Sequence, residues 1–230
     1  MKELLFLLAD LWMIYAGFRY GWRFIREYHN YLLGLEWFCV ATSGTNFLVW
    51  TVLGGPLHGP LYEIAFFFDA FSRAIGITLI AVLGLMRVTH RYKASLPVEI
   101  GSFALAVVVG VYLGQFKDEH HLYVGPATFY VVVNALATVY FAYFSWRLWK
   151  IRATGLAVLT GVATVAAVAI AWTYNFFPFP DDEYRTTFYI LALTVWGLQE
   201  LAYFLGYKAL HEHNVARGLE PVATPHPVHA

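Results

Sequence analysis

Seven apolar segments of about twenty residues or more limit this chain to one kind of fold. A helix of about 20 apolar residues crosses a hydrocarbon core about 30 Å thick. A chain in lipid must satisfy its backbone hydrogen bonds internally, and runs such as GLAVLTGVATVAAVAIAW lack the alternating polarity of barrel strands. We therefore predict an all-α integral membrane protein with seven transmembrane helices. The predicted spans are 3–24, 32–54, 61–88, 97–116, 122–147, 154–177 and 185–208.

The composition agrees with a membrane protein and excludes several classes of function. Hydrophobic residues make up 60% of the chain, charged residues make up 13%, and the mean hydropathy is +0.57. The net charge of zero gives no electrostatic reason to expect nucleic acid binding. A single cysteine, Cys39, excludes a disulfide framework, and no Cys/His zinc spacing occurs. We expect membrane lipid and a small molecule as partners, no metal and no cofactor, and the sequence leaves a homo-oligomer open.

Loop charges predict the orientation of the spans. Basic residues follow the first, third, fifth and seventh spans, whereas the other side carries Lys2, Lys117 and Arg185 among acids. The positive-inside rule then places the N-terminus outside and the C-terminus in the cytoplasm of the bacterial inner (plasma) membrane. We interpret residues 1–210 as one transmembrane domain and the polar, proline-containing segment 211–230 as a flexible cytoplasmic tail.

Comparison of the chain with itself indicates an internal repeat. An offset of 122 gives nine identities in the 31 positions from Val40 to Ala70, including Trp50 with Trp172. An offset of 124 extends the match to Asp10/Asn134, Trp22/Trp146, Arg23/Arg147 and Arg26/Lys150. We predict parallel triplet halves, 1–88 and 122–208, joined by the linker helix 97–116 in a 3+1+3 arrangement. Transporters with parallel repeats bind their solute near the midplane between the halves.

The triplet–linker–triplet layout, with VATSGTNFLVWTVLGGPL in span two and WTYNFF in span six, resembles the SWEET and PQ-loop sugar transporters. In that family a tryptophan from each half and an asparagine from each third helix line the pocket. The resemblance implies that Trp50 and Trp172 contact the solute and that Asp69 lies near the position of the first asparagine.

Polar residues inside the spans are the candidate site residues. Asp69 and Arg73 lie four apart on one helical face and can form an ion pair. Such a pair either lines a pocket or only joins helices. Glu200 has no cation within one turn, which suits a protonatable group, although a hydrogen bond to a neighbouring helix is the alternative. Asp10 and Asn134 also lie deep, whereas Glu36 lies close enough to a span end to reach water.

An intramembrane enzyme is the second interpretation. The segment QELAYFLGY resembles the last helix of membrane-bound terpene cyclases, where an acid precedes a tyrosine by three residues, as Glu200 precedes Tyr203. Those enzymes carry a second acid in a Trp-Glu pair of the second span, and this chain has Glu36-Trp37 in that span. The resemblance implies acid chemistry on a lipid-like substrate, with Asp69, Glu200 and Glu36 as candidate catalytic acids.

We expect first a small-solute or proton-coupled transporter with a midplane pocket between the triplets. The alternative functions are an intramembrane enzyme and an accessory or sensory membrane protein. The residues predicted to contact the solute are Trp50, Asp69, Arg73, Asn134, Trp172 and Glu200.

Overall fold

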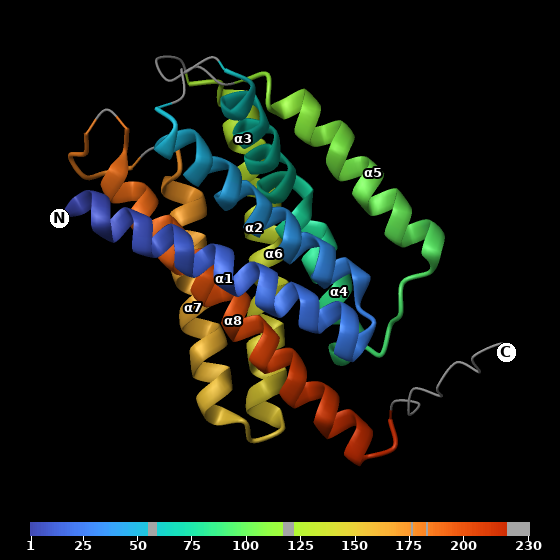
Figure 1. Ribbon diagram of the computed structural model, residues 1–230. Coiled ribbons are helices and arrows are strands. Elements are labelled where there is room, and N and C mark those ends of the chain that lie inside the picture. Colours follow the sequence, from blue (N-terminus) through green and yellow to red (C-terminus); the bar gives the residue numbers. More distant parts are fainter. Residues whose placement is uncertain (55–58, 117–121, 176, 183, 220–230) are drawn as a thin grey trace, which may run out of the picture.

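The computed structural model describes residues 1–54, 59–116, 122–175, 177–182 and 184–219. Within these ranges the regular structure is helical throughout, and seven helices are long and apolar enough to cross a membrane (Figure 1). The all-helical prediction and the number of possible spans are confirmed. The predicted outer-loop residue Lys117 and the last part of the predicted tail, 220–230, lie outside the described ranges.

The third span differs from the other six in its helical geometry. It runs continuously over Pro60–Thr89 and consists of α3 (Pro60–Phe71), the π-helix η1 (Ser72–Ile80) and α4 (Ala81–Thr89). π turns are rare and occur most often at functional sites. The remaining spans are α1 (Lys2–Tyr28), α2 (Tyr31–Val52), α5 (Leu96–Leu113), α6 (Val124–Lys150), α7 (Thr154–Thr173) and α8 (Thr186–Ala216).

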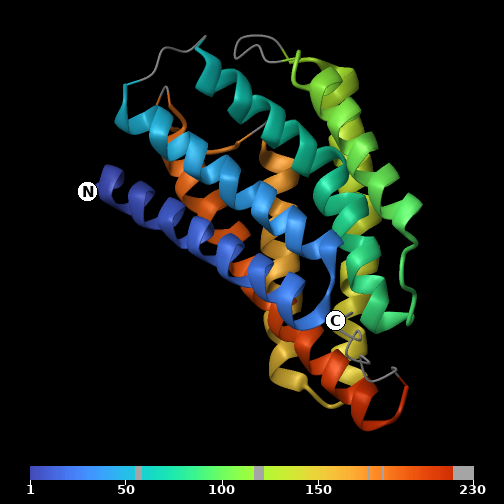
Figure 2. The ribbon, with the colours of Figure 1, turned by 45° about the vertical axis from the view of Figure 1, so that its right-hand side comes forward.

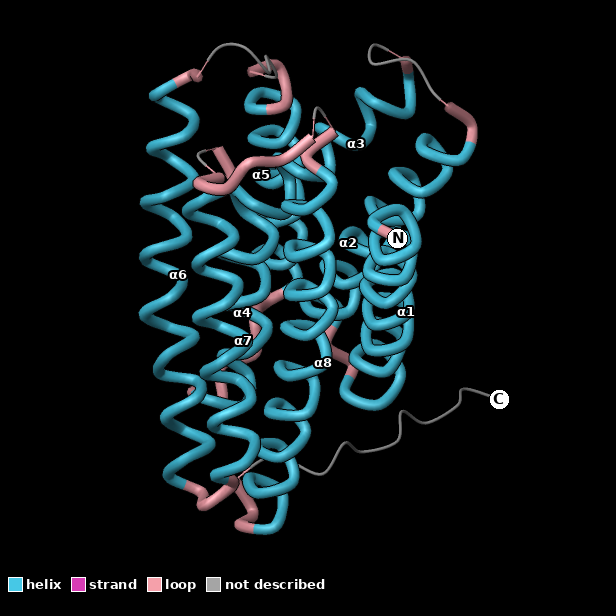
Figure 3. Tube along the Cα trace, turned by 90° about the vertical axis from the view of Figure 1, so that its left-hand side faces the viewer, coloured by secondary structure: helices cyan, strands magenta, loops and turns pink. Residues whose placement is uncertain are grey.

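Six of the spans that the structure describes form a closed ring. α1 lies between α2 and α8, α2 packs on the third span, the third span packs on α6, and α7 lies between α6 and α8. The first and last helices of the chain therefore run side by side (Figures 1 and 2). In Figure 3, α6 and α1 occupy opposite sides of the bundle, with α8 between them. α5 packs on α3 and η1 from outside the ring.

The two ends of the bundle differ in charge. We name the end at which α1, α4, α6 and α8 finish the basic end, because Arg26, Arg87 and Lys150 lie in the last turns of α1, α4 and α6. The Arg87 Nη1 donates a hydrogen bond of 2.8 Å to the carbonyl of His29, which joins α4 to the end of α1. The other end of the bundle is called the opposite end below.

The basic end is tightly packed and linked across the ring. Most of the largest fully buried side chains lie in this half of the bundle, among them Trp37, Tyr203, Tyr207, Phe144 and Leu85. In contrast, the side chains of α2 and α3 at the opposite end are mostly partly exposed or exposed.

Three hydrogen bonds close the basic end. Asn214 of α8 donates to the Val88 carbonyl at 2.9 Å, and Arg147 of α6 donates to the Thr89 carbonyl at 2.5 Å. The Thr89 and Tyr140 hydroxyls share a hydrogen bond of 2.6 Å. We name these contacts the basic-end latch, because they hold α4 to both α6 and α8.

α8 extends further at the basic end than the sequence predicts. The predicted span ends at residue 208 and the predicted tail begins at 211, yet the helix continues to Ala216. Asn214, which lies in the predicted tail, is 2% exposed, so one face of these additional turns packs against the bundle. The predicted tail therefore has a helical first part.

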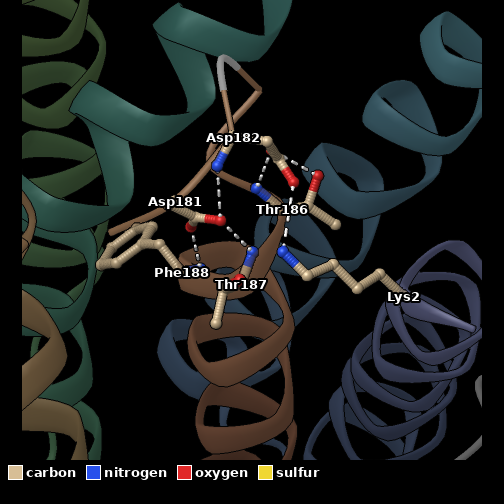
Figure 4. Close-up of polar contacts among 6 residues, drawn as sticks. All are labelled: Lys2, Asp181, Asp182, Thr186, Thr187 and Phe188. Carbon is tan, nitrogen blue, oxygen red and sulfur yellow. Dashed lines mark hydrogen bonds and ion pairs between the residues drawn. The ribbon is translucent and has the colours of Figure 1, made fainter. Parts of the chain in front are cut away.

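Two aspartates satisfy the first backbone donors of α8 (Figure 4). Asp181 accepts from the N–H groups of Thr187 at 3.0 Å and Phe188 at 2.8 Å. Asp182 accepts from the N–H of Thr186 at 2.9 Å. The first N–H groups of a helix have no partner within the helix, and negative charge there is favourable. The DDEYR segment thus starts the last span.

Candidate functional site

The predicted ion pair between Asp69 and Arg73 is formed. Asp69 lies in the last turn of α3 and Arg73 in the first turn of the π-helix η1. The Arg73 Nε lies 2.9 and 3.0 Å from the two Asp69 oxygens, and Nη2 lies 2.6 Å from Oδ2. Both side chains are partly shielded, with 15% of Arg73 and 19% of Asp69 exposed. The pair is therefore close to the interior without being sealed in it.

Two tyrosines pack against the guanidinium of Arg73. Its central carbon lies 4.0 Å from the ring centre of Tyr130 in α6 and 3.7 Å from that of Tyr174 at the end of α7. Cations are attracted to the faces of aromatic rings, most strongly where water is excluded. The hydroxyl of Tyr174 is also a hydrogen-bond partner of Tyr189 in α8. We name Asp69, Arg73, Tyr130, Tyr174 and Tyr189 the tyrosine cage.

Asn134 supports this cage from α6. Its Nδ2 donates to the Arg73 carbonyl at 3.2 Å and to the Tyr130 carbonyl at 2.9 Å. Backbone carbonyls in a π segment lack the regular α-helical partners, so a side-chain donor can stabilise the irregular turn. The predicted solute contact Asn134 thus donates to the backbone carbonyls of two cage residues.

The two predicted tryptophans lie in different environments. Trp50 is half-buried and packs on Phe47 and Tyr62, with ring centres 5.7 and 5.9 Å away. Trp172 is 48% exposed on α7. It precedes Tyr174 by two residues, so the two side chains point about 200° apart around the helix. The structure thus brings Tyr174, rather than Trp172, to the Asp69–Arg73 pair.

Glu36 and Glu200 form a second polar site. Their side chains, from α2 and α8, are 0% and 3% exposed, and their carboxylates are close enough to repel each other. None of the four oxygens accepts a hydrogen bond from a residue that the structure describes, although the Ser72 hydroxyl lies close to Glu36. The indole of Trp37 donates to the Glu200 backbone carbonyl at 3.3 Å, which fixes α2 against α8.

Glu36 is buried, whereas the sequence predicted that it lies close enough to a span end to reach water. Glu36 lies only five residues after the start of α2. However, it is covered because its side chain faces η1, where Gly76 leaves space for the carboxylate. A Cβ atom at Gly76 would lie 2.2 Å from Glu36 Oε1. The position of a residue along its own span gives no information about which residues of a neighbouring span cover it.

Asp10 is a third buried acid. Its side chain in α1 is 0% exposed, and neither carboxylate oxygen has a hydrogen-bond partner among the described residues. Its Oδ1 faces Gly44 of α2, where a Cβ would lie 2.9 Å away. Charged groups at bilayer depth are costly and usually functional. Asp10, Glu36 and Glu200 are therefore all candidates for binding protons.

Sequence reasoning missed the tyrosines of the cage and Gly76. Tyr130 precedes Asn134 by four residues, which places both on one face of a helix, and this spacing could have indicated a shared contact. Tyr174 and Tyr189 are brought in by tertiary packing, for which one sequence offers no signal. Comparisons of the chain with protein families, curated proteins and solved structures find no match.

Proposed function

We propose that this chain is a proton-coupled membrane transporter for a small solute. The Glu36–Glu200 pair would carry the proton, and the tyrosine cage with the half-buried Trp50 would contact the solute. The observation that carries the proposal is the acid pair itself: two carboxylates, one on each of two helices, buried without a cation and close enough to repel each other. In a low-dielectric interior two such groups are costly when both are charged, so they favour binding a proton.

The arrangement of the helices supports an exchange between two conformations. If residues 1–88 and 122–208 are repeats, Glu36 belongs to one half and Glu200 to the other. The ring then has the order of two triplets related by a rotation, because α1 contacts α8 and the third span contacts α6. Some matched positions also agree in exposure: Ala41 and Ala163 are both 0% exposed, and Trp22 and Trp146 are 54% and 49% exposed, whereas Trp50 and Trp172 differ.

The difference between the two ends of the bundle supports the same proposal. The basic-end latch joins α4 to α6 and α8, whereas the side chains of α2 and α3 near Asp69 remain partly exposed. This is the packing expected of a transporter that is closed at one end. Charging Glu36 and Glu200 would push α2 and α8 apart, and proton binding would allow them to close. Proton binding would thereby be coupled to the movement of the halves.

Uptake into liposomes tests the proposal. Purified protein is reconstituted with a trapped pH-sensitive dye, and sugars, amino acids and small carboxylates are added outside in turn. We expect one class to cause proton entry, and we expect Glu36→Gln and Glu200→Gln each to reduce it at least tenfold. Glu3→Gln, which changes an exposed acid at the start of α1, is the matched control. Proton entry that persists in both buried-acid variants would contradict the proposal.

We propose that the basic end faces the cytoplasm, as the positive-inside rule predicts. The last turns of α1, α4 and α6 at this end carry Arg26, Arg87, Arg147 and Lys150. In bacterial cells, a fluorescent protein fused after Ala230 should then be fluorescent, and alkaline phosphatase fused there should be inactive. The reverse result would invert the proposed orientation.

An intramembrane enzyme is the second candidate, and one observation favours it. Glu36 and Glu200 lie on the second and last spans, the two spans that carry the acids in the terpene-cyclase resemblance, and are close enough to repel each other. The Tyr203 hydroxyl, one turn further along the last span, is hydrogen-bonded by Thr164 and Gln199 at 2.9 and 3.1 Å. The pair could protonate an alkene or epoxide and later remove a proton, which isomerises a lipid-like substrate without a net change in atoms.

Incubation with prenylated epoxides in lipid nanodiscs tests the enzyme. A product of equal mass and altered chromatographic retention, absent with Glu200→Gln, would favour it over the transporter. Failure of both assays would favour the accessory or sensory role, in which the acids only join helices.

A further inference from the structure

One edge of the Arg73 guanidinium carries donors that Asp69 does not use. A guanidinium has five N–H donors. Asp69 engages Nε and Nη2 only, and the buried Nη1 has no hydrogen-bond partner among the residues that the structure describes. Buried donors of charged groups are normally satisfied, because leaving them without an acceptor costs more than a lost hydrogen bond. The cage therefore offers an acceptor site with a fixed direction.

The surrounding groups decide the sign of the charge that this site would take. The rings of Tyr130 and Tyr174 pack against the guanidinium, with its central carbon 4.0 and 3.7 Å from their centres, so they restrict the directions from which a group can approach it. The Asp69 oxygens already accept from Arg73, with Oδ1 bound by Nε and Oδ2 by both Nε and Nη2. A cationic solute would have to displace Arg73 from Asp69, whereas an anionic oxygen would meet an unused donor.

The amount of charge is limited as well. Asp69 offsets the single positive charge of Arg73, and only one edge remains open, which suits a monoanion better than a phosphate with two charges. Carboxylate geometry matches the donors of a guanidinium. The ligand class that fits the site is thus a small carboxylate.

Aromatic side chains pack in a row from Trp50 through Tyr62 to Phe66, which lies one helical turn from Asp69. The rings of Trp50 and Tyr62 lie 5.9 Å apart, and those of Tyr62 and Phe66 lie 4.6 Å apart. Phe66 precedes Asp69 by three residues in α3, so both lie on one face of that helix. These side chains are half-buried, as are Asp69 and Arg73. A planar apolar body would pack on such rings while its charged group reaches Arg73.

We propose that the tyrosine cage binds a small aromatic monocarboxylate, with its carboxylate accepting from Arg73 Nη1. This inference rests on the proposed transport function, because it names the class of solute carried. Solute and proton would then move together as an electrically neutral pair.

Binding is tested in detergent micelles by the thermal unfolding of the whole chain with benzoate and with its neutral analogue benzamide. We expect benzoate at millimolar concentration to raise the melting temperature in a saturable manner, and benzamide to have no effect. Arg73→Lys, which keeps the charge but loses the guanidinium fork, should weaken benzoate binding at least tenfold. Equal shifts with benzoate and benzamide would overturn the inference.

Arg23→Gln is a matched control at the other end of the bundle. Arg23 also pairs with an acid four residues away, Glu27 at 2.6 Å, and also stacks on a ring, Phe204 at 4.4 Å. This variant should keep the benzoate shift. Because Arg73→Gln alone leaves Asp69 without its cation, the double variant Asp69→Asn/Arg73→Gln removes both charges. It should fold, as judged by gel filtration, and lose the shift; a retained shift would overturn the inference.

The outcomes separate this inference from the proposed function. Benzoate binding that depends on Arg73, without uptake of any carboxylate into liposomes, would overturn the transport function and leave the binding site standing. Proton-coupled uptake of a different solute class, with no benzoate binding, would overturn the inference and leave the transport function standing.

Discussion

At the scale of single residues, glycines make room for the three buried acids. A Cβ would lie 2.9 Å from Glu200 Oε1 at Gly17, 2.9 Å from Asp10 Oδ1 at Gly44 and 2.2 Å from Glu36 Oε1 at Gly76. Real Cβ atoms do not approach other atoms so closely without a shift in the structure. Each acid is therefore accommodated by a glycine on a neighbouring helix.

Gly76→Ala tests this relation. Because the added methyl group would overlap the Glu36 carboxylate, we expect a loss of about 1–3 kcal/mol, the usual result of overpacking. Thermal unfolding in detergent measures the loss as a lower melting temperature. Gly101→Ala in α5, where a Cβ meets nothing within 4 Å, is the control and should be neutral or slightly stabilising. An unchanged melting temperature for Gly76→Ala would contradict the close packing of Glu36.

The sequence predicted some of these residues and missed others for identifiable reasons. The Asp69–Arg73 pair follows from a spacing of four on one helix, which is local information. Glu36 and Glu200 are separated by most of the chain, and a single sequence carries no signal that they lie near each other in the folded protein. The same holds for Tyr174 and Tyr189 in the cage.

At the scale of elements, the start of α8 depends on charged caps. Burial alone would raise the pKa of Asp181, but the backbone N–H groups of Phe188 and Thr187 outweigh it and lower this pKa from 3.8 to about 2. A carboxylate with a lower pKa in the folded state stabilises that state above the unfolded value, near pH 3.8. Its contribution is lost as the pH falls toward 2.

Asp181→Asn should therefore be destabilising at neutral pH, by about 0.3–1 kcal/mol, the usual contribution of a negative charge at the N-terminus of a helix. The difference in melting temperature between the wild-type protein and the variant should be constant from pH 5 to 7 and should shrink between pH 4 and 2. Glu3→Gln, an exposed acid near the same end, provides the comparison. A difference that grows on acidification would contradict the assigned role.

The ends of the helices were predictable to within a few residues, except at the C-terminal end of α8. Apolar length located all seven spans, because lipid requires about 20 apolar residues for each. The end of α8 was missed because Asn214, a polar residue, is buried against α4 and donates to the Val88 carbonyl. The π-helix was missed because Ser72–Ile80 has no composition that distinguishes it from an α-helix.

At the scale of the whole molecule, the basic-end latch should control access to the interior. We expect Asn214→Ala to loosen α8 from α4, because the Val88 carbonyl loses its donor. A cysteine introduced at the fully buried Leu85, in a Cys39→Ser background, should then react several-fold faster with a small thiol reagent. Ser145→Ala removes a hydroxyl bonded only within α6 and should leave the rate unchanged. Equal rates would show that the latch does not control opening.

The position of α5 outside the ring affects how the chain could be divided. This helix packs on α3 and η1, so it belongs with the first three spans. A gene split between the codons for Phe116 and Leu122 would yield a piece with the first four spans and a piece with the last three, and would leave every described helix whole. When they are coexpressed, the two polypeptides should reassemble into a working protein, because packing between described helices joins the two pieces.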